Sequence, residues 1–159
     1  MNRRRIVIIL IFVAIALICS CKSEPELSGE ADRVASVGLV ASSSILDKYS
    51  ETGSYSGVSM RVSGNTICYS LSDASITIDL SIVEASMGTH TIKVDGEVVY
   101  TYEAYPATYP YSVSYNIRFT YAGKNHTLEI KGKWTGVSST TVSLLKVDGK
   151  SYDPSSLNR

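Results

Sequence analysis

Polar and apolar residues alternate without a break in the stretch Ser75-Ile76-Thr77-Ile78-Asp79-Leu80-Ser81-Ile82. Successive side chains of an extended chain point to opposite faces, so this period of two predicts a strand with one apolar and one polar face. Shorter versions of the pattern occur at 58–62 and 67–71, and the Gly64-Asn65 turn between them predicts a hairpin. We therefore expect the chain from residue 57 onward to form an antiparallel sheet with one buried face.

Further turn signals divide the rest of the chain into short strands. They are Asp95-Gly96, Gly123-Lys124-Asn125 and Asp148-Gly149. Glycine accepts the positive φ that tight hairpin turns require. The resulting number of strands, about eight, is typical of an antiparallel sandwich or a small barrel.

Residues 31–50 predict a helix ahead of the strands. Apolar residues recur there at steps of three and four, which places them on one stripe. They are Val34, Val37, Ala41, Ile45 and Tyr49. The predicted fold class is therefore all-β, an antiparallel sandwich or small barrel, with one N-terminal helix that covers an edge or an open end of the sheet.

The first 21 residues have the layout of a secretory signal. Residues 1–5 include three arginines, residues 6–18 are an unbroken apolar run of 13 residues, and Ile18-Cys19-Ser20 leads directly to Cys21. A helix that spans the bilayer core needs about 20 apolar residues, so this run is too short to cross. With an aliphatic residue three positions before Cys21 and a small residue just before it, the segment resembles the signal peptide of bacterial lipoproteins.

The resemblance implies cleavage before Cys21 and a diacylglycerol thioether on this cysteine, with a further acyl chain on the new N-terminus. Several acyl chains together anchor a protein almost permanently. The expected location is the cell envelope, at the outer membrane or cell surface if the bacterium has two membranes. The two alternatives are a cleaved signal that releases a soluble protein and a membrane-spanning helix. The expected organisation is a signal peptide at 1–21, a flexible tether at 22–30 and a single β-rich domain with its N-terminal helix at 31–159.

The composition of the mature chain argues against several function classes. The 15 basic residues less the three leader arginines leave 12, against 15 acidic residues, so nucleic acid is not an expected partner. Once Cys21 is acylated, Cys68 is the only thiol left, which excludes an internal disulfide. His90 and His126 have no cysteine or carboxylate cluster at metal-ligand spacing around them, so we expect no metal, no cofactor and no catalytic residue.

The tyrosines are concentrated in one part of the chain. Seven of the 11 lie between Tyr100 and Tyr121, and they are densest in the segment 105–111, Tyr-Pro-Ala-Thr-Tyr-Pro-Tyr. Two prolines predict a loop between strands. We take Tyr105, Tyr109 and Tyr111 as candidate contact residues for a protein or a glycan, because tyrosine combines a wide ring with a hydroxyl. The alternative is that these rings pack over the end of the β-domain.

Trp134 follows Leu128, Ile130 and Gly132 at a period of two, so all four are expected on one face. A core position is the main interpretation for Trp134, and a pocket wall beside the glycine is the alternative.

The expected function is a non-enzymatic binding or interaction domain held at a membrane by covalent lipid. One alternative is a lipocalin-like carrier that holds an apolar ligand inside a barrel, and another is an envelope enzyme. A carrier needs small side chains on its inner face, whereas Ile76, Ile78 and Leu80 indicate a filled core.

Replacement of Cys21 by serine is expected to abolish acylation and to release the protein from the membrane fraction, because a serine hydroxyl does not form the lipid thioether. Intact-mass analysis and cell fractionation measure both effects. Cys19→Ser is the matched control and should remain acylated. A wild-type protein that still begins at Met1, or that lacks fatty acid, contradicts the anchor.

Overall fold

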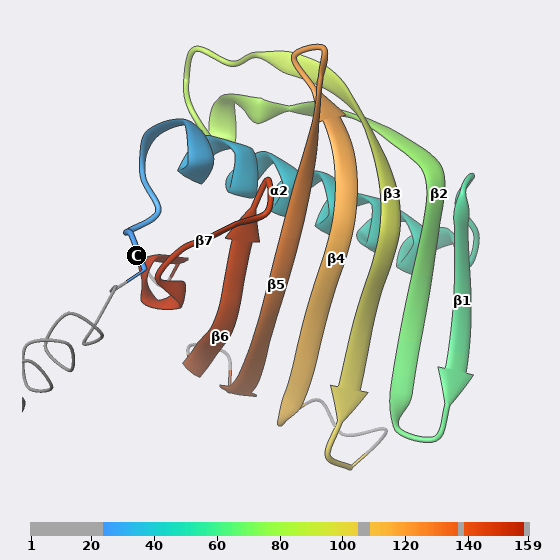
Figure 1. The fold of residues 1–159 in the computed structure, drawn as a ribbon. Helices are drawn as coiled ribbons and strands as arrows, with labels where there is room; N and C mark the ends of the chain where they lie inside the picture. The colour runs from blue at the N-terminus through green and yellow to red at the C-terminus, as the bar shows by residue number, and fades with distance from the viewer. Residues whose placement is uncertain (1–23, 105–108, 137–138, 158–159) are drawn as a thin grey trace, which may run out of the picture.

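The computed structural model describes residues 24–104, 109–136 and 139–157. One helix, α2 (Gly29–Thr52), lies across one face of a seven-stranded antiparallel sheet (Figure 1). Each strand pairs with its neighbours in the sequence, in the order β1 to β7. The strands are β1 (Val58–Ser63), β2 (Thr66–Asp79), β3 (Thr89–Tyr102), β4 (Tyr111–Tyr121), β5 (Lys124–Gly136), β6 (Ser139–Val147) and β7 (Lys150–Ser151).

The predicted class, antiparallel β-structure with one N-terminal helix, is confirmed. The described strands form a single open sheet with β1 and β7 at its edges, and therefore neither a two-sheet sandwich nor a closed barrel. The physical reason is the polarity of the two faces: the apolar face packs under the helix, and the other face is polar enough to meet water without a second layer.

The Asp95-Gly96 turn prediction is wrong, because β3 continues through both residues. Gly96 has a φ of 118°, and a Cβ at this position would lie 2.2 Å from the Asn116 carbonyl oxygen. The glycine thus allows β3 and β4 to approach closely. Opposite it, the pairing of β2 with β3 shifts between Leu71 and Ala74, and this bulge joins the predicted strand at 67–71 to residues 75–79 of the next one in the single strand β2. The strand predicted over 75–82 is wrong for its last three residues, because Leu80–Ile82 form a 3₁₀ turn, η1, in which Ile82 is exposed.

The predicted helical stripe is confirmed, and the helix is two residues longer at each end than predicted. Val34, Val37, Ala41 and Ile45 are all buried against the sheet. Gly53 caps the C-terminal end of the helix: it has a φ of 73° and donates its amide hydrogen to the Tyr49 carbonyl at 2.8 Å. At Gly38 the helix backbone comes so close to the sheet that a Cβ would lie 2.6 Å from Phe119 Cε1.

In the described part of the segment predicted as a tether, 22–30, two residues contact the C-terminal end of the domain, and every residue of that part except Leu27 is exposed. Leu27 is buried, and its amide donates to Ser156 Oγ at 3.1 Å. The Pro25 carbonyl accepts the Asp153 amide at 2.9 Å. The partners lie in or beside the 3₁₀ turn η2 (Pro154–Leu157), more than 120 residues away in the sequence, so local composition does not reveal the contact.

Gly38→Val is expected to lower the free energy of unfolding by about 2 kcal/mol, because the added side chain would overlap the buried ring of Phe119. Urea denaturation measures the change. Gly136→Val is the matched control: nothing lies within 4 Å of a Cβ built there, so its effect should stay within about 0.5 kcal/mol. Equal midpoints for the two variants would contradict the close approach of helix and sheet.

Candidate binding surface

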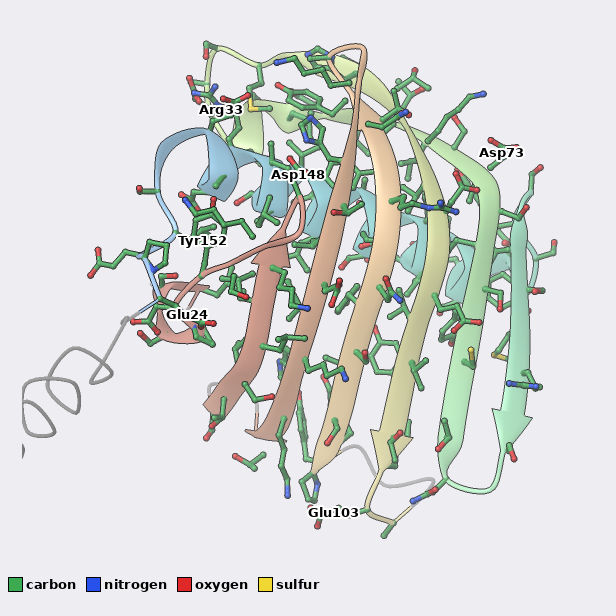
Figure 2. All side chains as sticks on the ribbon, in the orientation of Figure 1. Glu24, Arg33, Asp73, Glu103, Asp148 and Tyr152 are labelled. Atoms are coloured by element: carbon green, nitrogen blue, oxygen red, sulfur yellow. The ribbon has the colours of Figure 1, made fainter. Side chains whose placement is uncertain are left out.

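The two faces of the sheet differ in chemistry. Gly38 of α2 lies over Phe119 of β4 and Leu128 of β5, so these two side chains face the helix. Because side chains of a strand alternate between its faces, every second residue counted from Phe119 or Leu128 faces the helix as well. The opposite face carries many side chains that contain nitrogen or oxygen (Figure 2). Among them are the hydroxyls of Thr77 and Thr91, whose oxygens lie 2.8 Å apart. The apolar face is therefore the one that contains both the core and any apolar surface left uncovered.

The helix covers only part of this apolar face. Figure 1 shows α2 crossing the sheet nearer one end of the strands, while the strands extend beyond it to the end where β3 finishes and β4 begins. Six half-buried aromatic residues gather toward that end, and we call them the aromatic half-face. They are Tyr69, Tyr100, Tyr102, Tyr109, Tyr111 and Trp134.

The rings of the aromatic half-face form a continuous chain of contacts. Tyr69 and Tyr100 meet edge to face with ring centroids 6.1 Å apart, and Tyr100 lies 5.9 Å from Tyr111. Tyr111 in turn stacks on Tyr109, with ring centroids 5.3 Å apart, and on Trp134, with ring centroids 5.8 Å apart. The ring planes of Tyr111 and Trp134 lie within 2° of parallel. Such ring pairs add stability beyond area burial, so the rings support one another in a fixed arrangement.

Trp134 lies between the core and this open surface. A Cβ on Gly132 would lie 2.8 Å from Cζ3 of Trp134, so the indole ring occupies the space that the glycine leaves beside it. The residue is half-buried and packs against the core cluster from its margin. The predicted shared face of Leu128, Ile130 and Trp134 is confirmed by the strand register, but Trp134 is a boundary residue.

Trp134 is also one wall of a groove between helix and sheet, with a volume of about 390 Å³. Most of the lining is apolar, and the hydroxyls of Ser43 and Thr140 add two polar groups. The lining residues are Leu39, Ser43, Tyr115, Ile130, Trp134, Thr140, Val142 and Leu157. Apolar walls with a few polar groups are typical of ligand sites.

Burial governs the electrostatics of the tyrosines. The pKa of Tyr100 is raised far above its ordinary value, first because burial penalises the phenolate and then through the neighbouring hydroxyl of Tyr115. Burial also raises the pKa of Tyr111, with Tyr109 and Tyr102 adding to the effect. Both hydroxyls are therefore protonated and neutral at physiological pH, and they act there as hydrogen-bonding groups.

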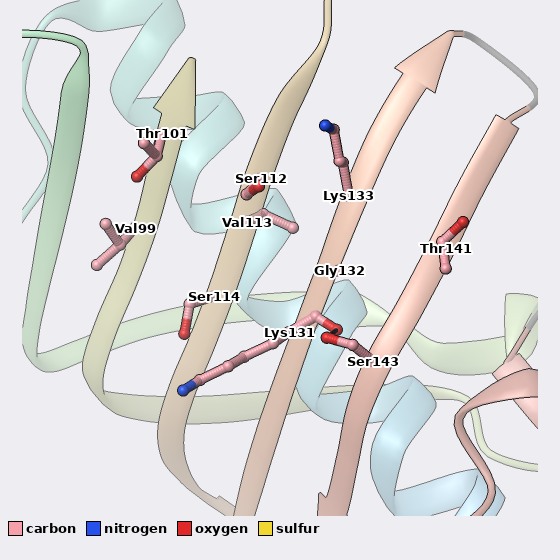
Figure 3. A pocket seen from close by; sticks show the side chains of 10 residues that line it. All are labelled: Val99, Thr101, Ser112, Val113, Ser114, Lys131, Gly132, Lys133, Thr141 and Ser143. Carbon is pink, nitrogen blue, oxygen red and sulfur yellow. Dashed lines mark hydrogen bonds between the residues drawn. The ribbon is translucent and has the colours of Figure 1, made fainter. Parts of the chain in front are cut away.

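A second hollow, of about 350 Å³, lies on the polar face (Figure 3). Its lining is rich in small hydroxyl residues, with Lys131 and Lys133 beside them. Lys133 forms an ion pair with Glu103, and Ser143 donates its hydroxyl to the Lys131 carbonyl at 3.3 Å. Because charged and hydroxyl-bearing side chains make up most of its lining, this hollow resembles a site for an apolar ligand less than the groove on the helix side does.

The two histidines have structural partners. His126 is buried, and its Nδ1 lies 2.9 Å from Oδ2 of Asp148, whose other oxygen accepts the Thr127 amide at 2.8 Å. This pair holds the β6–β7 turn against β5. His90 Nε2 lies 2.7 Å from the Met87 carbonyl. Among the described residues, no group of three or more histidine, cysteine, aspartate or glutamate side chains is arranged to hold a metal ion.

The structure brings together part of the predicted site. Tyr109 and Tyr111 are both members of the aromatic half-face, whereas Tyr105 and the predicted lipid site Cys21 lie outside the described residues. Sequence reasoning missed Tyr69, Tyr100 and Tyr102 as site residues. A signal was present for two of them, since Tyr100 and Tyr102 are two residues apart and share one face of a strand.

No protein-family model, no curated protein and no solved structure matches this chain. Within residues 24–104, 109–136 and 139–157, no helix combines the length and apolarity needed to cross a membrane.

The raised pKa values of Tyr100 and Tyr111 predict a loss of stability at alkaline pH. A raised folded-state pKa contributes stability that is present below the unfolded tyrosine value of about 10 and is lost as the pH rises through the folded value. Urea midpoints measured from pH 8 to pH 12 should therefore fall above pH 10. Tyr100→Phe should flatten this fall and Ser112→Ala should not; equal slopes for both variants would contradict the burial of Tyr100.

Proposed function

We propose that this protein is a lipid-anchored, non-enzymatic binding domain of the bacterial cell envelope, and that the aromatic half-face contacts its partner, a protein or a glycan. One observation carries the proposal: six aromatic residues in mutual contact occupy the part of the apolar face that the helix leaves uncovered. Apolar surface gathered in one place on a folded domain marks an interaction site.

The chemistry of the rings supports contact with a partner. Tyrosine and tryptophan offer a large rigid surface with few rotatable bonds, so little conformational entropy is lost when a partner binds. The hydroxyls of Tyr100 and Tyr111 stay protonated, because burial raises the pKa of each. They suit hydrogen bonding better than proton transfer at neutral pH, which favours a binding role over acid–base catalysis.

The expected anchor would hold this surface near a membrane. Only three residues separate Cys21 from Pro25, whose carbonyl is bonded to Asp153 beside η2. At no more than about 3.6 Å per residue, an extended connection reaches about 14 Å. With lipid on Cys21, the η2 end of the domain would lie close to the bilayer, and partners within the envelope would be in reach.

The groove favours a second candidate function, the binding of a small apolar ligand. Its position between α2 and the sheet differs from the barrel interior of a lipocalin-like carrier, since the described strands form an open sheet. Leu39, Ile130 and Val142 would contact an acyl chain or a similar group. Native mass spectrometry of protein from its own host tests this candidate, and repeated recovery of empty protein would count against it.

Tyr111→Ala and Trp134→Ala are expected to weaken partner binding by about 2 kcal/mol each, about thirtyfold in Kd, because central aromatic contacts dominate binding surfaces. Glycan and peptide arrays identify the partner class, and titration of the hit measures the change. Ser112→Ala is the matched control, since Ser112 is exposed on the opposite face next to Tyr111.

The outcomes separate surface binding from the other functions. Circular dichroism of each variant first establishes that the fold is retained. Equal affinity of the wild type and both aromatic variants would remove the aromatic half-face as the contact. A hit that is lost only with Ser112→Ala would place the site on the polar face.

A further inference from the structure

The two edges of the sheet are protected to different degrees. Beyond β6, the pairing of Lys146 with Ser151 and a bond from the Tyr152 amide to the Leu145 carbonyl at 3.0 Å cover part of the edge. A shift in register between Lys131 and Gly132 makes the rest of the β5–β6 pairing irregular. The β1 edge is a regular strand of six residues, five of them exposed, and no described segment pairs with its outer side (Figure 1). Edges of this kind are templates for pairing with another strand.

The backbone groups that point outward from β1 follow from its pairing with β2. The Ser72 amide donates to the Gly57 carbonyl at 2.8 Å, so these two residues form a hydrogen-bonded pair. Hydrogen-bonded pairs alternate with non-bonded pairs in an antiparallel ladder. Since Met60 and Val62 lie three and five positions from Gly57, their amide and carbonyl groups are directed away from β2.

The outward-facing residues are also the exposed apolar ones. Met60 retains 44% and Val62 retains 48% of their accessible surface. Their register partners in β2 are Tyr69 and Ile67, so both side chains lie on the helix-side face and extend the aromatic half-face to the edge of the sheet. Arg61 lies between them on the polar face, opposite Cys68.

We propose that a second copy of this chain pairs with β1, strand to strand and antiparallel, about a two-fold axis at Met60. In this register Met60 meets Met60 of the second copy, and Val62 meets its Val58, so the apolar side chains oppose one another. In the same register Arg61 lies opposite Ser59 of the second copy. A register centred on residue 61 would instead place the two Arg61 side chains directly opposite each other. This register is thus symmetric in its apolar side chains, and it keeps the two Arg61 charges from lying directly opposite each other.

The pairing would extend the sheet across both copies and join their aromatic half-faces. Met60 and Val62 would lie at the centre, with Tyr69 of each copy beside them. The resulting apolar surface would be twice as wide as that of one copy. The proposal does not depend on the lipid anchor or on the identity of the partner.

Disulfide trapping in the full chain tests this register. Two opposed residues of a hydrogen-bonded antiparallel pair have Cα atoms about 5.5 Å apart, a distance that a disulfide spans. After mild oxidation, Met60→Cys should give a band at twice the monomer mass on a non-reducing gel. The parent chain carries the same native cysteines and is one control. Ile82→Cys, 73% exposed and distant from β1 in the sequence, is the control for random collision.

Proline at position 62 supplies a second test in the Met60→Cys background. The Val62 amide faces away from β2, so Val62→Pro removes a donor from the free edge and leaves the β1–β2 bonds in place. The dimer band should be lost with Val62→Pro and retained with Val62→Ala.

Three results would overturn the proposal. They are equal dimer bands for Met60→Cys and Ile82→Cys, a dimer that survives Val62→Pro, and a Met60→Cys adduct with a different polypeptide. The last result would assign the edge to another extended partner.

Discussion

The contact of Gly38 with Phe119 and Leu128 is the constraint on which the rest of this structure depends. A glycine at this point lets the helix backbone approach the sheet, and the apolar stripe of α2 is then buried along its length. A helix with its side chains is about 10–12 Å wide, whereas strands of 11 to 14 residues extend over roughly 37 to 48 Å. One helix therefore cannot cover one face of this sheet, and part of the apolar face is left to other uses.

The residues on the uncovered part are adapted to that position. Tyrosines and one tryptophan occupy it instead of leucine and isoleucine, and these side chains combine a large apolar ring with a group that can form a hydrogen bond. Gly132 makes room for the Trp134 ring, as Gly38 makes room for the helix. The polar face opposite needs no cover, which explains why a chain of this size forms one sheet and not two. The exposed strand β1 continues the same apolar surface to the edge.

Much of the fold could be predicted from the sequence, because hydrophobic period and turn chemistry are local properties. The β1–β2 hairpin, the β4–β5 and β6–β7 turns and the stripe of the helix all follow from them. The error at Asp95-Gly96 has a physical cause: a glycine needed for close approach to Asn116 has the same local sequence signal as a glycine in a turn. The docking of Leu27 on Ser156 escaped prediction for the opposite reason, since no local pattern marks a contact across the whole domain.

The sequence by itself determined the strand faces, the helix and the concentration of tyrosines around residues 100–121. Only the tertiary structure decided which of these tyrosines share a surface and that Tyr69 and Trp134 join them, because these contacts run between strands whose order and register depend on pairing. It also decided between a layered sandwich, a closed barrel and an open sheet. Alternation of side chains is the same in all three, and the choice depends on how much of the apolar face a single helix can cover.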